Sequence, residues 1–306
     1  AELEKKIHTL LKKVQHEIEA PVHRGKGELP LDNSDAILIT YGDNLQQEGK
    51  TPLANLRDFA DAKLRDIFSG IHILPFFPYS SDDGFSIIDY YKVNPQFGTW
   101  REIREIGKVF KLMSDLVLNH CSVKNEWFQK FLRDDPHYKN YFISLEKDTD
   151  VSMIVRPRTH PLLTPFETEH GTEYVWTTFS ADQVDLNFSN PEVLLEMLKV
   201  MLFHIQNGIQ IIRLDAIAYL WKELGHPSIH HDKTHAVVKL FRSVLNIAAP
   251  WVVVITETNV PHAENISYFG NMTDEARMVY QFRLPPLVLD AFARDDARHI
   301  RTWASE

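Results

Sequence analysis

The chain has 306 residues, of which 44% are hydrophobic and 25% are charged, and its formal net charge at pH 7 is −9. This composition is that of an ordinary globular protein with a sizeable core. The acidic balance argues against general binding to nucleic acid or to anionic membranes, which need a basic surface. No stretch is long and apolar enough to span a membrane. Cys121 is the only cysteine, which excludes an internal disulfide, so we expect a reducing, cytoplasmic compartment.

The pattern of apolar residues predicts helices and strands in alternation. Apolar residues at helical spacing predict a helix over 3–18, and Pro and Gly residues between 21 and 30 predict a linker after it. Apolar strands that alternate with helices indicate a parallel sheet buried on both faces. We expect strands at 36–41, 70–76, 110–117, 209–214, 252–256 and 278–282, and helices at 53–68, 99–109, 190–207, 234–248 and 288–303.

The strand spacing and the polar strand ends favour an α/β fold of the (β/α)8 TIM-barrel type over an open sheet. Only about six strands are found, so we expect a barrel truncated after about six strands, in a chain that is part of a longer protein. The connection between the third and fourth strands is too long for a single helix, which indicates an inserted subdomain. We therefore predict an N-terminal helix and linker (1–34), an incomplete barrel (35–120 and 186–306) and an inserted subdomain (121–185).

Polar residues at three successive strand ends carry the chemistry. The segments are Asp115–His120, Arg213–Ala216 and Thr256–Asn259, and in a barrel of this type the carboxyl ends of the strands form the active site. Cleavage of a glycosidic bond with retention needs one carboxylate to attack the anomeric carbon and another to protonate the leaving oxygen.

Asp215 is the candidate nucleophile and Glu257 the candidate acid/base. Arg213 lies two residues before Asp215 and so on the same side of the strand, where a guanidinium favours the ionised carboxylate. Glu257 needs a pKa raised by apolar surroundings. The alternative is a buried Arg213–Asp215 ion pair that only supports the barrel, but three such strand ends together favour catalysis.

Other side chains are candidates for sugar binding. A neutral His120, beside Asn119, can hydrogen-bond a sugar hydroxyl, although a lone His on a strand is usually a core residue. Asp82 could bind hydroxyl groups, and Phe85 could stack on a sugar ring. The Asp-Asp-Gly sequence there, taken alone, favours a plain turn.

Arg156 and Arg158, held apart by a proline, suit a phosphate or a carboxylate, and a solvated loop is an equal alternative. The remaining histidines lack convincing spacing for a metal site, and no P-loop or dinucleotide fingerprint is present. We therefore expect neither a metal nor a cofactor.

The three segments resemble conserved regions of the α-amylase superfamily, glycoside hydrolase family 13. Ile73–Ser86, Arg156–Arg158, Val175–Asn187 and Phe282–Leu287 are similar to the sucrose phosphorylase subfamily. Within the subfamily, the chain is most similar to the glucosylglycerate phosphorylases and the sucrose 6′-phosphate phosphorylases. Sucrose phosphorylases have a phosphate-binding His where this chain has Asn259, which argues against unsubstituted sucrose as the preferred substrate.

The resemblance implies a retaining α-glucoside phosphorylase, whose partners are a small α-glucoside and inorganic phosphate and whose product is α-glucose 1-phosphate. It implies phosphate or acceptor binding by Arg156 and Arg158. It implies substrate binding by Asp82, Phe85, Asn119, His120, Arg213, Tyr219 and Asn259. The acceptor, among glycerate, fructose 6-phosphate, fructose and glycerol derivatives, stays open, as does the oligomeric state.

Two alternatives remain: an α-glucoside hydrolase or transglucosidase of the same superfamily, and a non-catalytic sugar-binding fragment. The family has a third catalytic Asp, in an His-Asp motif after the seventh strand, and the 306 residues end before such a motif. We therefore expect little or no turnover from the 306-residue chain alone.

Overall fold

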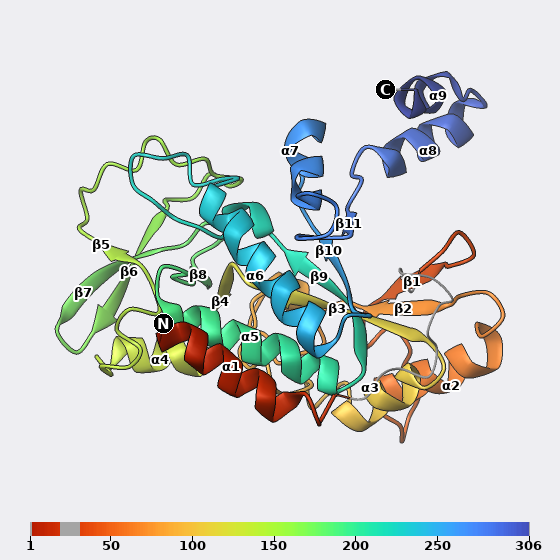
Figure 1. The fold of residues 1–306 in the computed structure, drawn as a ribbon, viewed down its shortest axis with the longest axis horizontal. Coiled ribbons are helices and arrows are strands. Elements are labelled where there is room, and N and C mark those ends of the chain that lie inside the picture. Colours follow the sequence, from red (N-terminus) through yellow and green to blue (C-terminus); the bar gives the residue numbers. More distant parts are fainter. Residues whose placement is uncertain (1, 19–30, 306) are drawn as a thin grey trace.

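The computed structural model describes residues 2–18 and 31–305, so most of the predicted linker lies outside the described residues. Within them, the predicted strands form one parallel sheet, which confirms the truncated barrel (Figure 1). The strands follow in the order β1 (Ile37–Thr40), β2 (Gly70–Ile73), β3 (Lys111–Val117), β9 (Ile209–Asp215), β10 (Val253–Thr256) and β11 (Met278–Val279). The predicted sixth strand, 278–282, is shorter than expected.

Side chains alternate between the two faces of this sheet, as the period of a strand requires. One face packs against helices in the main apolar core, and Ile212 and Leu214 of β9 belong to it. The other face lines the lumen, where Met113, Ile211 and Val253 form a small cluster of their own. Alternation along β9 therefore sends residues 211, 213 and 215 to the lumen, which is the face that carries the site.

Helices cover the outer face of the sheet. They are α2 (Pro52–Lys63), α3 (Trp100–Gly107), α5 (Pro191–Gln206) and α6 (Asp232–Ala248), and α1 (Glu2–Val14) packs against α5 and α6. Local sequence sets their first turns: Thr99 and Glu102 form a capping box at α3, and the Asn190 side chain accepts from Glu192 N at α5. The helices predicted at these places are confirmed.

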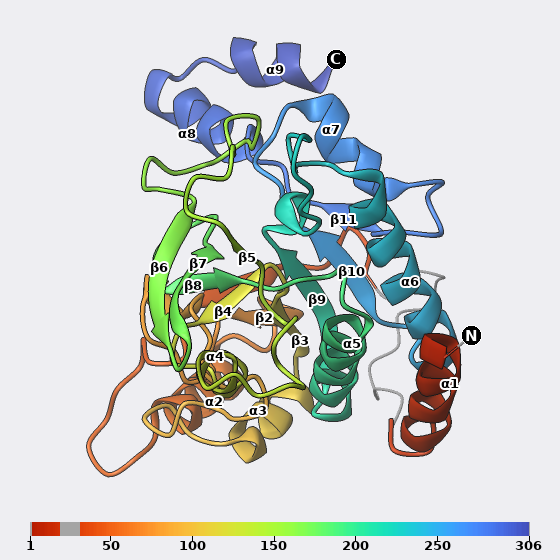
Figure 2. The same ribbon diagram turned by 90° about the vertical axis from the view of Figure 1, so that its left-hand side faces the viewer.

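The long connection after β3 contains short antiparallel sheets. β4 (His120–Ser122) pairs with β8 (Gln183–Asp185), and β7 (Gly171–Trp176) pairs with both β5 (Ser144–Leu145) and β6 (Leu163–Thr168). Helix α4 (Glu126–Leu132) lies between β4 and β5. Because β4 follows β3 almost directly and pairs with β8, the connection leaves and returns at the mouth of the barrel (Figure 2).

The single helix predicted over 288–303 is wrong. The structure has α8 (Leu284–Arg294) and α9 (Arg298–Ala304), with Asp295 between them in the left-handed region at a φ of 51°. The Asp296 side chain accepts from Arg298 N and so starts a new helix, a local bond that apolar spacing does not reveal. Neither helix has a buried residue, and both stand away from the sheet (Figure 1).

Four short elements remain in the described residues. Helix α7 (His262–Ile266) runs into the 3₁₀ turn η3 (Ser267–Phe269) before β11. The 3₁₀ turns η1 (Asp82–Gly84) and η2 (Ile217–Tyr219) both carry residues of the site described next. No helix within residues 2–18 and 31–305 is long and apolar enough to cross a membrane.

Candidate active site

The end of β9 is shaped so that Asp215 stands at the mouth of the lumen. Asp215 is the last residue of the strand, and Ala216 follows it at a φ of 50°, in the left-handed region. An alanine there costs about 1 kcal/mol, and such residues cluster at functional sites. The reversal turns the chain into η2, and it leaves Ala216 N free to donate to Glu257 Oε2 at 3.0 Å.

One guanidinium faces three carboxylates in the lumen. Arg213 Nη1 lies 2.5 Å from Asp115 Oδ1 and 2.7 Å from Asp215 Oδ1, and Nη2 lies 3.9 Å from Glu257 Oε2. The strands β3, β9 and β10 are neighbours in the sheet, and Asp115 stands opposite Arg213 in the register. The buried ion pair weighed from the sequence is therefore present, and it lies beside both candidate catalytic carboxylates.

The Arg213 guanidinium also lies between two aromatic rings, 5.6 Å from the centroid of Phe85 and 5.3 Å from that of Tyr280. These contacts limit its movement and attract its charge to the ring faces. Phe85, predicted to stack on a sugar, thus lies at the site. Tyr280, which lies just after β11, was missed, because nothing in its spacing shows that its ring reaches Arg213.

Of the two candidate catalytic carboxyl groups, Asp215 is buried and Glu257 is partly buried, and the two interact with each other. Burial raises the pKa of Asp215, and Arg213 opposes this effect without outweighing it. Burial, followed by the charge of Asp215, raises the pKa of Glu257. Arg213 contacts Asp215 directly and Glu257 only at 3.9 Å, so its charge favours the ionised form of Asp215 more than that of Glu257.

His120 is neutral, and its neighbours fix its tautomer. Burial lowers the pKa of its imidazole. Asn119 Nδ2 lies 3.2 Å from His120 Nδ1 and can only donate, so the His120 proton is on Nε2, which donates to Phe85 O at 3.1 Å. Gln183 Nε2 also lies 3.1 Å from His120 Nε2. The hydrogen bond that Gln183 Nε2 donates goes to Asp82 Oδ2, at 2.8 Å.

A buried lysine, Lys222, holds the Asn119 side chain by a hydrogen bond. Lys222 Nζ lies 2.7 Å from Asn119 Oδ1 and 3.0 Å from Asp185 Oδ2, with 2% and 0% exposure for the Lys222 and Asp185 side chains. Asp185 also accepts from Thr178 N and Oγ1 and from Asn119 Nδ2. Sequence reasoning missed Lys222, Asp185 and Gln183, because nothing in their spacing shows that β8 returns to the site.

The loop after β2 is both a turn and part of the site. Asp82 is exposed and adopts a φ of 56° in η1, as the turn signal predicts, while its carboxylate accepts from Gln183. The Asp182 carboxylate accepts from the hydroxyl groups of Ser80, Ser81 and Ser86, which ties this loop to the connection before β8.

The remaining predicted residues differ in their distance from the carboxylates. Tyr219 packs edge-on against Phe179 with centroids 5.4 Å apart. Burial, followed by the charge of Glu257, raises the pKa of Tyr219, and the charge of Arg158 opposes them. Arg156 is exposed and donates to His160 O at 2.6 Å. Asn259 is exposed just beyond β10.

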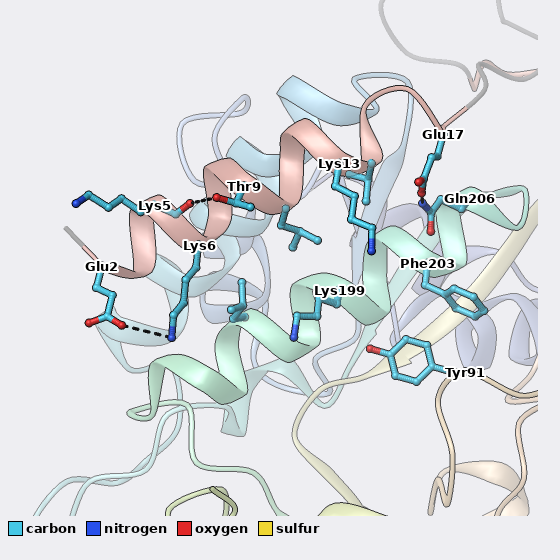
Figure 3. A pocket seen from close by; sticks show the side chains of 13 residues that line it. Glu2, Lys5, Lys6, Thr9, Lys13, Glu17, Tyr91, Lys199, Phe203 and Gln206 are labelled. Atoms are coloured by element: carbon cyan, nitrogen blue, oxygen red, sulfur yellow. Dashed lines mark hydrogen bonds and ion pairs between the residues drawn. The ribbon is translucent and has the colours of Figure 1, made fainter.

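A second hollow lies far from these carboxylates, between α1 and α5 (Figure 3). It has a volume of 580 Å³. Its charged rim is largely paired within the protein: Lys6 with Glu192, and Lys199 with Glu196. It lacks the convergent carboxylates that sugar chemistry needs. Among the described residues, no group of three or more His, Cys, Asp or Glu side chains could hold a metal ion.

Comparisons with known proteins show the family to which the chain belongs. Residues 64–303 match the family model of the α-amylase catalytic domain. The chain is 59% identical to a glucosylglycerate phosphorylase of Spirochaeta thermophila, over 97% of this chain and 51% of that protein. It is 48% identical to a glucosylglycerate phosphorylase of Escherichia coli, over 89% of this chain and 49% of that protein.

Among solved structures, the chain resembles that of sucrose 6F-phosphate phosphorylase from Thermoanaerobacter thermosaccharolyticum. The TM-score is 0.79 at 27% identity, covering 92% of this chain and 58% of that chain. The chain thus spans about half the length of the curated relatives it matches.

Proposed function

The chain belongs to the α-amylase family, and from that premise we propose that it carries the nucleophile and the acid/base of a retaining α-glucoside phosphorylase. The single observation that supports this most strongly is the arrangement of Asp215 and Glu257 around Arg213. The similarity to phosphorylases at 48–59% identity favours phosphate over water as the second substrate.

In the proposed first step, an Asp215 oxygen attacks C1 of the glucosyl group as the C1–O bond to the aglycone breaks. The proton of Glu257 passes to the departing oxygen, so the aglycone leaves as an alcohol. The positive charge of Arg213 stabilises the ionised form of the Asp215 carboxylate in spite of its burial. The product of this step is a covalent glucosyl-enzyme.

In the second step, a phosphate oxygen attacks C1 and displaces Asp215. Glu257, now ionised, accepts the proton of the incoming phosphate, which restores the resting site. Two inversions at C1 give net retention, and the product is α-glucose 1-phosphate. Asp82 is proposed to hold a glucose hydroxyl, joined by His120 when its Nε2–H turns from Phe85 O to the sugar, and Phe85 to pack on the sugar ring.

The aglycone and phosphate are proposed to bind beside Tyr219, on whose hydroxyl the charges of both Glu257 and Arg158 act. A guanidinium there suits a phosphate or a carboxylate, and glycerate is an aglycone of the latter kind. Arg156 and Asn259 are proposed as more peripheral contributors. We propose that residues 121–185 act as a subdomain that closes this side, and that the enzyme works in the cytoplasm, where the single Cys121 stays reduced.

The test is release of glucose 1-phosphate from glucosylglycerate, sucrose 6′-phosphate and sucrose, each with and without phosphate. Both the 306-residue chain and a polypeptide of the relatives' full length are assayed. Asp215→Asn is the inactive control. Phosphate-dependent release that Asp215→Asn abolishes supports the proposal, and the best donor identifies the aglycone.

Two other results would replace the proposal. Glucose release that does not need phosphate would identify a hydrolase or transglucosidase. Sugar binding without turnover in either polypeptide would identify a non-catalytic binding module. Trapping with a fluorinated glucosyl fluoride, followed by mass spectrometry, separates these two because only the first forms a bond to Asp215.

A further inference from the structure

A column of polar side chains continues below the candidate site into the lumen. His72 of β2 is 1% exposed, and its Nε2 lies 2.8 Å from Asp115 Oδ2. The other oxygen of that carboxylate, Oδ1, lies 2.5 Å from Arg213 Nη1, which in turn lies 2.7 Å from Asp215 Oδ1. Three strands thus contribute to one chain of contacts that ends at the candidate nucleophile.

We propose that His72 is a positioning residue: by binding Asp115, it fixes the guanidinium of Arg213 against the Asp215 carboxylate. The inference rests on the proposed function in so far as Asp215 is the nucleophile. His72 touches neither the candidate nucleophile nor the candidate acid/base, so its effect passes through Asp115 and Arg213.

The sharing of one nitrogen explains why Asp115 needs a second partner. Asp115 Oδ1 and Asp215 Oδ1 both accept from Nη1 of Arg213. Asp115 is fully buried, and a buried carboxylate without enough donors draws the nearest cation toward itself. With His72 as a donor to Oδ2, both oxygens of Asp115 are bound, and Arg213 stays between the two carboxylates.

The surroundings of His72 show that a polar residue at this position is costly. His72 pairs in register with Ile39 and Met113, and Met113 belongs to the apolar cluster of the lumen. Within the described residues, His72 Nδ1 is buried and has no hydrogen-bond partner. An aliphatic side chain would fit the apolar layer without that loss, so the bond to Asp115 is the contact that accounts for an imidazole here.

The ionisable groups around this column come from several elements. Those that interact electrostatically with Asp115 or Arg213 are Tyr41, His72, Asp215, Glu257 and Tyr280. Three of the acidic groups, Asp115, Asp215 and Glu257, face the single guanidinium. Any loss of contact between Arg213 and Asp215 therefore raises the affinity of Asp215 for a proton.

A second buried histidine provides a matched control. His204 on α5 is also fully buried, its Nε2 lies 3.0 Å from Tyr90 O, and its Nδ1 has no partner within the described residues. Its ring stacks on Phe77 with centroids 4.9 Å apart, on the outer face of the sheet. Substitution of His204 thus removes a similar hydrogen bond and similar packing without touching the column.

The experiment compares His72→Leu, His72→Gln and His204→Leu with the unmodified protein, each as a polypeptide of the relatives' full length. The rate of trapping by a fluorinated glucosyl fluoride reports on Asp215 and needs no phosphate. We expect the fluorinated glucosyl fluoride to trap His72→Leu about 10–100-fold more slowly, with its KM changed less than about threefold. The acid limb of the pH profile of the trapping rate should move to higher pH. His72→Gln, which keeps a donor, recovers part of the rate. His204→Leu loses stability in thermal unfolding but keeps the rate and the pH profile.

A titration of the Asp215 carboxyl carbon by NMR gives a readout that needs no turnover. The proposal expects a higher pKa of Asp215 in His72→Leu and an unchanged one in His204→Leu. An unchanged Asp215 pKa in folded His72→Leu, or the same shift in His204→Leu, overturns it. If the unmodified protein is never trapped, the proposed function fails, and the NMR titration still decides whether His72 positions Arg213.

Discussion

Replacement of Lys222 by Met tests how the inserted segment is held at the barrel mouth. The Lys222 side chain is 2% exposed, and its Nζ lies 3.0 Å from Asp185 Oδ2. Burial lowers the pKa of Lys222 although Asp185 opposes this, so the pair sits where charge is poorly solvated. Met has a similar length and no charge. The substitution leaves Asp185, which is fully buried, without a cation.

The expected loss follows from the geometry. Two unit charges 3.0 Å apart attract by about 5 kcal/mol at an effective dielectric constant of about 20, and desolvation of both charges offsets much of this. Removal of one partner forfeits the attraction while the other charge stays buried, which costs about 3–5 kcal/mol. Asp185 keeps the hydrogen bonds that Thr178 and Asn119 donate to it. We therefore expect Lys222→Met to lower the free energy of unfolding by about 3 kcal/mol, at the lower end of this range.

Denaturant unfolding of Lys222→Met measures this loss. The double variant Lys222→Met/Asp185→Asn removes the stranded charge and should be more stable than Lys222→Met. Lys233→Met is the matched control, because its ion pair with Glu223 is about half exposed and worth less than about 1 kcal/mol. A loss below about 1 kcal/mol for Lys222→Met, or no recovery in the double variant, would refute the reasoning.

Three further predictions concern the site itself. Asp215→Asn removes the attacking oxygen, so kcat should fall at least about 10⁴-fold and no glucosyl-enzyme should appear by mass spectrometry; a detectable adduct elsewhere would contradict the role of Asp215. Glu257→Gln should slow cleavage of donors with a poor leaving group about 10²–10⁴-fold and spare glucosyl fluoride. Because the pKa of Glu257 is raised in the folded state, its contribution to stability is full below the unfolded pKa of about 4.3 and is lost as pH rises through the folded pKa. Glu257→Gln should therefore be the more stable protein at neutral pH in denaturant unfolding, and equal stability would count against the burial argument. Arg158→Ala should raise the KM for phosphate about tenfold or more and leave the trapping rate unchanged; an unchanged KM would remove Arg158 from the phosphate site.

The sequence predicted the strands well because burial on both faces leaves an unmistakable apolar run. The strands predicted at 110–117 and 209–214 show this, because they match β3 and β9 to within one residue at each end. The helix predicted over 288–303 failed, because Asp295 and Asp296 end one helix and begin another through local bonds. Apolar spacing carries no information about such bonds.

The carboxylates at the mouth of the barrel could be predicted from the sequence alone. The alternation of β9 and the position of Glu257 after β10 follow from strand period and strand direction alone. Two features depend instead on neighbours from other strands. These are the burial that raises the pKa of Glu257 and the carboxylates that contact Arg213.

The side chains that bind and orient the residues around these carboxylates are apparent only from the tertiary structure. His72 and Asp115 are 43 residues apart in the chain, and Lys222 meets Asn119 across 103 residues. Such contacts depend on strand order and on the return of β8 to the barrel mouth, which no local pattern encodes. A single sequence therefore specifies the candidate catalytic groups, because each follows its own strand, while the packing of distant segments specifies the contacts that orient them.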